Sequence, residues 1–180
     1  MEQELIKVNS FINLYLFKNC HLDIKRITYL EKMVPPSLKE YVSHYSDNVY
    51  KIQSLLCYLT LLQLHDELIC FNENGCPYFP SNQIYFSISH NENDVILAVS
   101  KKPIGVDFIK CEKYDNYLKQ FLTSDINASD EEIANIIASK EALIKLNQLN
   151  LTYLNIIKKD DEVLLYKNID DKKIVIAYKI

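Results

Sequence analysis

Residues 84–109, IYFSISHNENDVILAVSKKPIGVDFI, carry the clearest strand pattern in the chain. Apolar and polar residues alternate through residues 84–89, which is the period of a strand with one buried face. A polar turn follows at residues 90–94, and residues 95–99 are again apolar. The pattern predicts an antiparallel hairpin.

A short polar joint, Lys101, Lys102 and Pro103, separates this hairpin from a third extended run at residues 104–109. Such a joint is typical of a boundary between two parts of a fold. We therefore expect an N-terminal lobe over residues 1–102 and a C-terminal lobe over residues 103–180, which together form one functional unit.

Two long helices are predicted from capping residues and apolar spacing. Asp47 precedes apolar residues that recur at helical spacing to about residue 64. Ser129, with Glu132 three residues later, predicts a capping box for a helix that reaches about residue 147.

A shorter helix is predicted where Ser37 and Glu40 follow two prolines, again as a capping box. Further strands are predicted at residues 11–17, 163–166 and 173–180. Each half of the chain then combines helix with antiparallel strands. This pattern predicts an α+β fold rather than a doubly wound parallel sheet.

Composition excludes several classes of protein. The 180 residues, 48% of them hydrophobic, suffice for one core or for two small lobes. Gly75 and Gly105 are the only glycines, so no Gly-rich phosphate loop, dinucleotide-binding turn or nucleophile elbow can be built. The net charge is −4 and Arg26 is the only arginine, which argues against a nucleic-acid surface. Any phosphate ligand is therefore expected to be small.

The cysteines and the N-terminal sequence bear on the cellular compartment. The cysteines are odd in number and form no Cys-x-x-Cys pair, which predicts reduced thiols rather than disulfides or zinc ligands. No run approaches the roughly 20 apolar residues of a membrane span. Glu2 and Glu4 stand where a signal peptide has a basic segment. We expect a cytoplasmic protein with no membrane partner.

Three places carry candidate chemistry, and the first is Ser89 and His90 at the end of the first hairpin strand. A histidine that leaves a strand into a turn can donate to an anionic ligand, or can satisfy a neighbouring backbone carbonyl. Both alternatives stay open on this segment alone.

The second place is Asp107 in the apolar run at residues 104–109. Period two puts Asp107 on the opposite face from Val106 and Phe108, and Gly105 on its own face leaves room beside the carboxylate. Burial of a carboxylate is costly unless it is paired or bound to metal. The alternative is an aspartate at an exposed strand end that caps the next turn.

The third place is the predicted helix through Lys140, Glu141 and Lys145. Lys140 falls in the middle of the apolar face, while Glu141 and Lys145, four residues apart, share its flank. The alternative is a surface pair with Lys140 extended along apolar neighbours to water. Asp107 and Glu141 could bind one Mg²⁺, and Lys145, Lys140 and His90 could neutralise the phosphates of its ligand.

The chain resembles the surfactin-type 4'-phosphopantetheinyl transferases in four motifs. Residues 75–77, Gly-Cys-Pro, resemble the family's Gly-Lys-Pro, and residues 86–90 resemble its Asn-Ile-Ser-His strand end. Residues 104–107 resemble its Gly-Ile-Asp strand, and residues 140–145 resemble its Lys-Glu-Ala/Ser-x-x-Lys helix. Order and spacing match over about residues 47–145. No single motif is decisive, but the four in sequence are fairly specific.

The resemblance implies a two-lobed α+β fold with pseudo-twofold symmetry and coenzyme A between the lobes, with Mg²⁺ on its pyrophosphate. It implies transfer of the phosphopantetheine arm to a serine of an acyl or peptidyl carrier protein, with release of 3',5'-ADP by a monomer. Asp107 and Glu141 would be metal ligands, and Glu141 would also accept the serine proton through a water. Lys145 would steady the pyrophosphate, and His90 would contact a phosphate of coenzyme A.

Further residues are assigned to the same ligands. The coenzyme-binding set also includes Ser89, Gly75, Lys140 and, for the 3'-phosphate, Lys51. Asn91, beside the motif histidine, is the candidate for a third metal ligand. The alternative is that Asn91 only shapes the turn with Asn93 and Asp94.

The chain also departs from the family pattern. Cys76 stands where the family usually has lysine, Ile109 where it often has a third acid, and Ile137 where Trp or Phe precedes the Lys-Glu pair. Residues 146–151 replace a Gly-x-Gly-Leu segment. These departures leave a second function open, a transferase-like protein that binds coenzyme A or a carrier domain without turnover.

Overall fold

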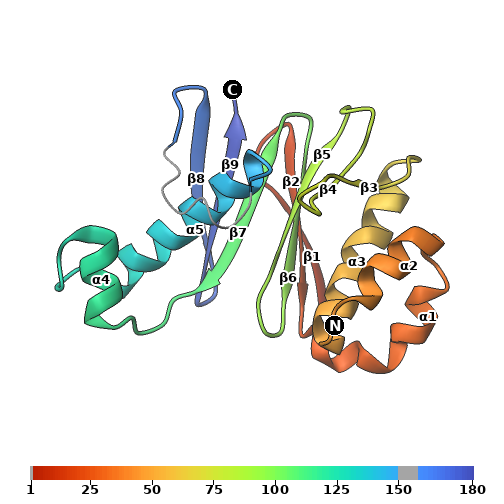
Figure 1. The fold of residues 1–180 in the computed structure, drawn as a ribbon, viewed down its shortest axis with the longest axis horizontal. Coiled ribbons are helices and arrows are strands. Elements are labelled where there is room, and N and C mark those ends of the chain that lie inside the picture. The colour runs from red at the N-terminus through yellow and green to blue at the C-terminus, as the bar shows by residue number, and fades with distance from the viewer. Residues whose placement is uncertain (1, 150–157) are drawn as a thin grey trace. The chain divides into compact units, whose positions relative to one another are not determined.

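The computed structural model describes residues 2–149 and 158–180. The chain folds into two compact units, Met1–Lys101 and Lys102–Ile180, which are the red-to-green and the green-to-blue parts of the ribbon (Figure 1). Each unit has its own antiparallel sheet and its own helices. The predicted α+β class is therefore confirmed. The part of residues 146–151 from residue 150 onward lies outside the described residues.

Unit 1 contains a four-stranded sheet in the order β1-β2-β6-β5, in which every neighbouring pair is antiparallel. The predicted hairpin is confirmed as β5 and β6, with His90 opposite Val95 at the turn. The strands of this sheet are β1 (Glu2–Lys7), β2 (Ile12–Lys18), β5 (Tyr85–His90) and β6 (Val95–Ser100).

The long helix α3 (Asn48–Leu64) packs its apolar residues against this sheet in the core of unit 1. It begins where the sequence predicts, because the side chain of Asp47 accepts a hydrogen bond of 2.6 Å from the backbone N–H of Val49. Phe17 of β2 and Leu97 of β6 are among the buried members of that core. The other elements of unit 1 are a 3₁₀ helix (Cys20–Arg26), α1 (Ile27–Glu31), α2 (Pro36–Ser43), β3 (Cys70–Phe71) and β4 (Pro77–Tyr78).

The predicted capping box of α2 is wrong. The helix begins at Pro36, one residue before Ser37, and its N-cap residue Pro35 makes no side-chain cap. Proline at the first helical position has a backbone dihedral that already suits a helix and lacks only an N–H that would have no helical partner. The proline pair therefore starts this helix without help from Ser37 and Glu40.

Unit 2 is a three-stranded antiparallel sheet in the order β7-β9-β8, with helix α5 packed on it. The predicted N-cap of α5 is confirmed, since the backbone N–H of Glu132 donates to Ser129 Oγ at 3.1 Å. The elements are β7 (Ile104–Lys110), α4 (Asn116–Thr123), α5 (Asp130–Leu146), β8 (Glu162–Ile169) and β9 (Lys172–Lys179).

Gly105 sets the approach of α5 to β7. A Cβ atom on Gly105 would lie 2.0 Å from the backbone oxygen of Ala142 and 2.5 Å from the backbone nitrogen of Leu146. Separations this short are not tolerated between non-bonded atoms, and both neighbours are backbone atoms that no rotamer change can move. Glycine at this position therefore lets the helix lie directly on the strand.

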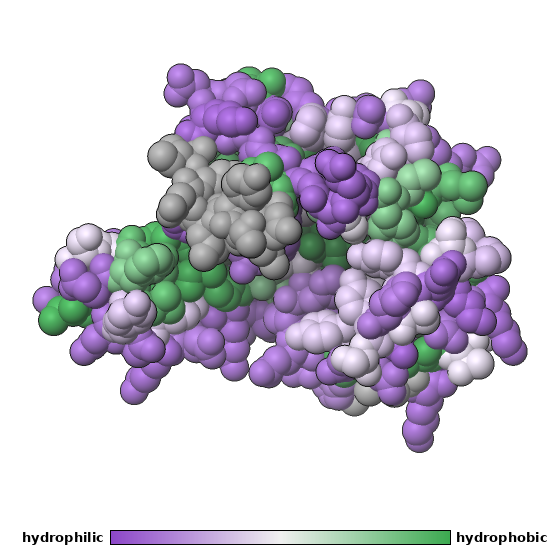
Figure 2. Space-filling model, viewed as in Figure 1, coloured by the Kyte–Doolittle hydropathy of each residue, from purple (hydrophilic) through white to green (hydrophobic). Residues whose placement is uncertain are grey.

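Two elements gave no clear signal in the sequence. β1 pairs with β2 along one edge of the sheet and is exposed at most positions, so it lacks the alternation of a half-buried strand. α4 has no buried residue, and Tyr117, Phe121 and Ile126 are exposed large hydrophobics in or just after it. Figure 2 shows hydrophobic side chains on the surface around this helix.

The described residues also bear on the thiols and on membrane insertion. All five cysteines are free thiols. Within residues 2–149 and 158–180, no helix has the length and hydropathy needed to cross a bilayer. The expectations of a cytoplasmic location and a monomeric state stay predictions.

We predict that Gly105→Ala lowers the free energy of unfolding by about 3 kcal/mol or more, because its methyl group would overlap the backbone of α5. Thermal and urea unfolding followed by circular dichroism measure the effect. Gly75→Ala is the matched control. Gly75 has φ +74°, but no atom lies within 4 Å of the place that an added methyl group would take. Its substitution should therefore lower the free energy of unfolding only by the roughly 1–2 kcal/mol that a left-handed backbone costs a residue with a Cβ. Equal losses in the two variants would contradict the close-contact role of Gly105.

Candidate functional site

Three charged side chains that the sequence singled out lie together in unit 2. Asp107 comes from β7, and Glu141 and Lys145 come from α5. The Lys145 Nζ atom donates to Asp107 Oδ1 at 2.8 Å and lies 3.9 Å from Glu141 Oε2. The structure thus forms one cluster of two carboxylates and one ammonium from a strand and a helix that are well separated in the chain.

The local geometry of both elements produces this cluster. Period two in β7 directs Asp107 to the same face as Gly105, which is the face covered by α5. The spacing of four residues places Glu141 and Lys145 one helical turn apart, on either side of Ala142 in the sequence. The predicted arrangement of Gly105 and Asp107 on one face is confirmed.

Burial and charge set the electrostatics of the cluster. The side chain of Asp107 is 6% exposed, that of Lys145 26% and that of Glu141 40%. Partial burial, and then the negative charge of Asp107, raise the pKa of the Glu141 carboxyl, while the ammonium of Lys145 opposes that rise. Because Glu141 stays partly exposed, solvent screens part of the repulsion between the carboxylates.

The two carboxylates fit a hard divalent cation in chemistry and in number of charges. Magnesium is commonly held by one or two carboxylates, with waters and substrate phosphates in its other positions. Burial, and then the negative charge of Asp107, disfavour ionisation of Glu141, and a bound cation would relieve the part that comes from charge repulsion. Within the described parts of the chain, no group of three or more His, Cys, Asp or Glu side chains could hold a metal.

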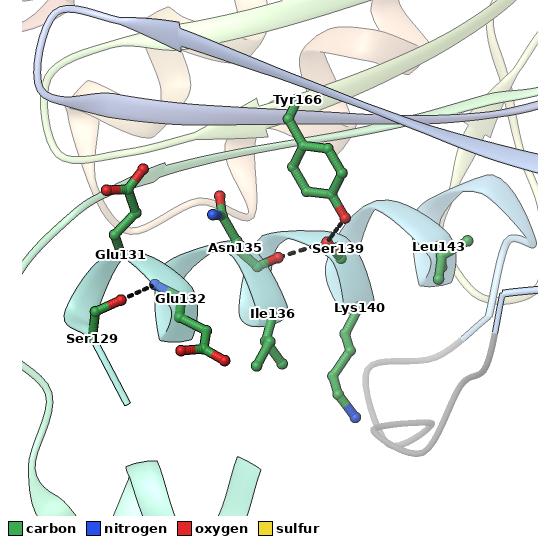
Figure 3. A pocket seen from close by; sticks show the side chains of 9 residues that line it. All are labelled: Ser129, Glu131, Glu132, Asn135, Ile136, Ser139, Lys140, Leu143 and Tyr166. Carbon is green, nitrogen blue, oxygen red and sulfur yellow. Dashed lines mark hydrogen bonds between the residues drawn. The ribbon is translucent and has the colours of Figure 1, made fainter. Parts of the chain in front are cut away.

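Lys140 does not join this cluster. It lines a pocket of about 560 Å³ on another side of α5, together with Glu132, Ile136 and other residues of that helix and Tyr166 of β8 (Figure 3). Figure 3 shows the Lys140 side chain directed to the same side of the helix as Glu132 and Ile136. The 100° step between successive helical residues turns Lys140 away from its neighbour Glu141. That Lys140 acts with Glu141 and Lys145 on one phosphate group stays a prediction.

In unit 1, His90 is held against helix α3. Its Nε2 atom lies 3.3 Å from Ser54 Oγ, and its ring makes an edge contact with Tyr50 at 5.9 Å between centroids. Ser54 is buried, whereas His90 is partly exposed. The preceding strand residue, Ser89, is 3% exposed. His90 therefore lies at the surface with one ring nitrogen supported from the core.

The turn after His90 is fixed by a buried glutamine that the sequence analysis missed. Gln53 of α3 is fully buried, and its Nε2 atom donates to the backbone oxygens of Asn91 at 2.9 Å and Asp94 at 3.0 Å. The signal in the sequence was a pair of polar residues, Gln53 and Ser54, within an otherwise apolar helical segment. Such a pair is costly to bury unless each member has hydrogen-bond partners.

Asn91 shapes this turn. Its Oδ1 atom accepts hydrogen bonds from the backbone N–H groups of Asn93 at 3.1 Å and Asp94 at 2.9 Å. Both lone pairs of that oxygen are then in use, so a cation could bind it only by displacing a backbone hydrogen bond. The structure favours the turn-shaping alternative over the predicted role of Asn91 as a metal ligand.

The remaining predicted residues are also described in unit 1. Gly75 adopts φ +74° in the turn between β3 and β4, and its carbonyl accepts a hydrogen bond of 3.3 Å from the Tyr41 hydroxyl. Cys76 follows it and is half-buried, and burial raises the pKa of its thiol. Lys51 lies in the first turn of α3 and is half-buried.

Neither the models of protein families nor the curated proteins contain a match to this chain. The resemblance to the surfactin-type transferases therefore rests on the four motifs and on the positions of their residues.

We predict that Gln53→Leu lowers the free energy of unfolding by about 1–3 kcal/mol, because the part-buried Asn91 carbonyl and the Asp94 carbonyl each lose the hydrogen bond donated by Gln53. Thr60→Val is the matched control in the same helix. The Thr60 hydroxyl donates to the Leu56 carbonyl within α3, and valine has nearly the same shape. The imidazole signals of His90 in NMR spectra should shift in Gln53→Leu and stay unchanged in Thr60→Val. Unchanged His90 signals in both variants would contradict the positioning role of Gln53.

We further predict a pH-dependent stability difference between the native chain and Glu141→Gln in metal-free buffer. The raised pKa means that folded Glu141 binds its proton more tightly than unfolded Glu141 does. Its stabilising contribution is therefore complete below the ordinary value of 4.5 and is lost as the pH rises through the folded pKa. The native chain should lose stability relative to Glu141→Gln over that interval, as measured by urea unfolding between about pH 4 and 8. A native chain that instead gains stability relative to Glu141→Gln as the pH rises would show the opposite sign of the shift.

Proposed function

We propose that this protein transfers the 4'-phosphopantetheine arm of coenzyme A to a serine of an acyl or peptidyl carrier protein, with release of 3',5'-ADP. The observation that carries the proposal is the cluster of Asp107, Glu141 and Lys145, formed by two of the four family-like motifs. These motifs are separated in the sequence, and their charged residues meet in unit 2. A surface pair on α5 alone would not include the buried Asp107.

In this proposal Asp107 and Glu141 hold Mg²⁺, which supplies positive charge to the pyrophosphate of coenzyme A when it is bound. Lys145 binds a pyrophosphate oxygen and stabilises the charge that develops on the departing 3',5'-ADP. The serine oxygen forms a bond to the phosphorus of the pantetheine phosphate, and the bond from that phosphorus to the bridging oxygen breaks. The serine proton passes through a water to Glu141, whose partly exposed side chain can contact that water.

Unit 1 contributes the family-like motifs that would contact the coenzyme. His90 lies at a strand end with one ring nitrogen beside Ser54, an arrangement that fixes the imidazole for a phosphate contact. Gly75 and the residues after it form the turn that resembles the family's Gly-Lys-Pro segment. A cytoplasmic, monomeric enzyme is part of the same proposal.

A second function is favoured by a specific observation, the missing charges at Cys76 and Ile109. Ile109 packs against the apolar cluster of α5 and β9, so it replaces the family's third acid with a packing side chain. Cys76 is a half-buried neutral thiol where the family has an ammonium. A protein with these changes would bind coenzyme A or a carrier domain with little or no turnover.

We predict phosphopantetheine transfer when the native chain is mixed with coenzyme A, Mg²⁺ and a panel of apo-carrier proteins. Mass spectrometry of the carrier detects the addition on serine. Asp107→Ala should lower the rate by about a hundredfold or more, because the pyrophosphate loses a metal ligand at the reacting centre. Asp160→Ala, which removes an exposed carboxylate from a turn in the same unit, is the control and should leave the rate unchanged.

Circular dichroism establishes that each variant is folded before its rate is interpreted. Near-native transfer by folded Asp107→Ala would overturn the assignment of the cluster. Absence of transfer to every carrier, with coenzyme A still bound in calorimetry, would favour the second function. Absence of both transfer and coenzyme binding would overturn the proposed function.

A further inference from the structure

Lys145 occupies the position of a counter-cation for Asp107. Its Nζ atom is 2.8 Å from Asp107 Oδ1 and 3.9 Å from Glu141 Oε2, so one ammonium contacts one carboxylate and lies near the other. The Asp107 side chain is only 6% exposed. A carboxylate this deeply buried requires a partner, and in the structure Lys145 is its charged partner.

We propose that Lys145 competes with the divalent cation for Asp107 and must leave this carboxylate when the metal binds. The inference rests on the proposed function, because it concerns the metal that function requires. Its physical basis is that an ammonium and a metal ion both bind the oxygens of a carboxylate directly. Lys145 therefore sets the affinity of the site for the metal and keeps the metal-free protein folded.

A count of charges gives the consequence for the ligand. Asp107, Glu141 and Lys145 together carry one net negative charge when all three are ionised. A divalent cation changes that sum to one net positive charge and leaves the Lys145 ammonium without its carboxylate. An anionic phosphate group would then be attracted by both cations. Metal binding and phosphate binding are therefore coupled in this site, with Lys145 as the group that exchanges one acceptor for another.

The side chain of Lys145 has room to make this exchange. It is 26% exposed, and it lies in the last turn of α5, four methylene groups away from the backbone. Asp107, by contrast, belongs to a strand whose position is fixed by the contact of Gly105 with α5. The lysine is the mobile partner of the pair, and the aspartate is the fixed one.

The experiment measures binding of Mn²⁺ as a probe in place of Mg²⁺, in the absence of coenzyme A, by the electron paramagnetic resonance signal of the free ion. Lys145→Met removes the competing ammonium and retains most of the apolar stem, so it should bind Mn²⁺ about tenfold more tightly than the native chain. Lys145→Arg retains a cation near Asp107 and should stay close to the native affinity. Lys140→Met is the matched control, because Lys140 is on the same helix but lines a different pocket.

Stability gives a second readout that activity does not influence. Metal-free Lys145→Met should melt at a lower temperature than the native chain, because the buried Asp107 carboxylate has lost its cation. Mn²⁺ should raise that melting temperature by more than it raises the native one. Should Lys145→Met fail to fold without metal, Lys145→Gln supplies the uncharged variant, since its amide can still donate to Asp107.

The outcomes separate this inference from the proposed function. Mn²⁺ binding by the native chain that is equal to or tighter than that of uncharged Lys145 variants would overturn the competition and leave the metal site standing. An equal gain in Mn²⁺ affinity in Lys140→Met would also overturn the competition. The gain would then come from the loss of any positive charge on α5 rather than from Lys145 in particular. No Mn²⁺ binding by any variant up to millimolar concentrations would overturn both the inference and the metal-dependent function.

Discussion

The backbone contact between α5 and β7 at Gly105 is the constraint on which the candidate site depends. The Ala142 carbonyl and the Leu146 amide occupy the space that any side chain at position 105 would need. Because Asp107 projects on the same face two residues later, the helix that rests on Gly105 also covers Asp107. The distance of 2.8 Å between Lys145 and Asp107 is thus a consequence of a missing side chain elsewhere in the strand.

Stability and the proposed function make opposite demands on the charged cluster. In a buried or half-buried setting an aspartate with a lysine partner is stable, and removal of either partner leaves an uncompensated charge. A metal-dependent reaction instead needs the carboxylate available to a cation and the ammonium available to a phosphate. Burial, and then the charge of Asp107, raise the pKa of the Glu141 carboxyl, and in the proposed function a bound cation would relieve the repulsion between the two carboxylates.

Local patterns in the sequence predict the parts of this protein that local forces determine. The hairpin of β5 and β6, the Asp47 cap and the Ser129 cap depend on residues within a few positions of one another, and all three are confirmed. Features that depend on contacts between residues far apart in the sequence are harder to predict from the sequence. The edge strand β1 and the exposed helix α4 lack a buried face, and the direction of Lys140 depends on which side of α5 meets the sheet.

In unit 1 the position of His90 depends on Gln53 and Ser54, two buried polar residues whose partners lie more than 35 positions away. Without the fold, a glutamine in an apolar helix indicates only that some partner exists.

The apolar side chain of Ile109 belongs to the same packing that builds the cluster. Ile109 is two residues beyond Asp107 on the face of β7 that meets α5, and it packs against the apolar cluster that includes Ala138, Ala142 and Val175. An acid at this position would have to direct its charge away from those side chains or bind a cation there. With isoleucine at this position the strand gains apolar contact and the cluster holds two carboxylates, so a single ammonium, that of Lys145, reduces the charge of the cluster to −1. An apolar side chain at position 109 thus leaves a cluster whose negative charge one lysine largely offsets.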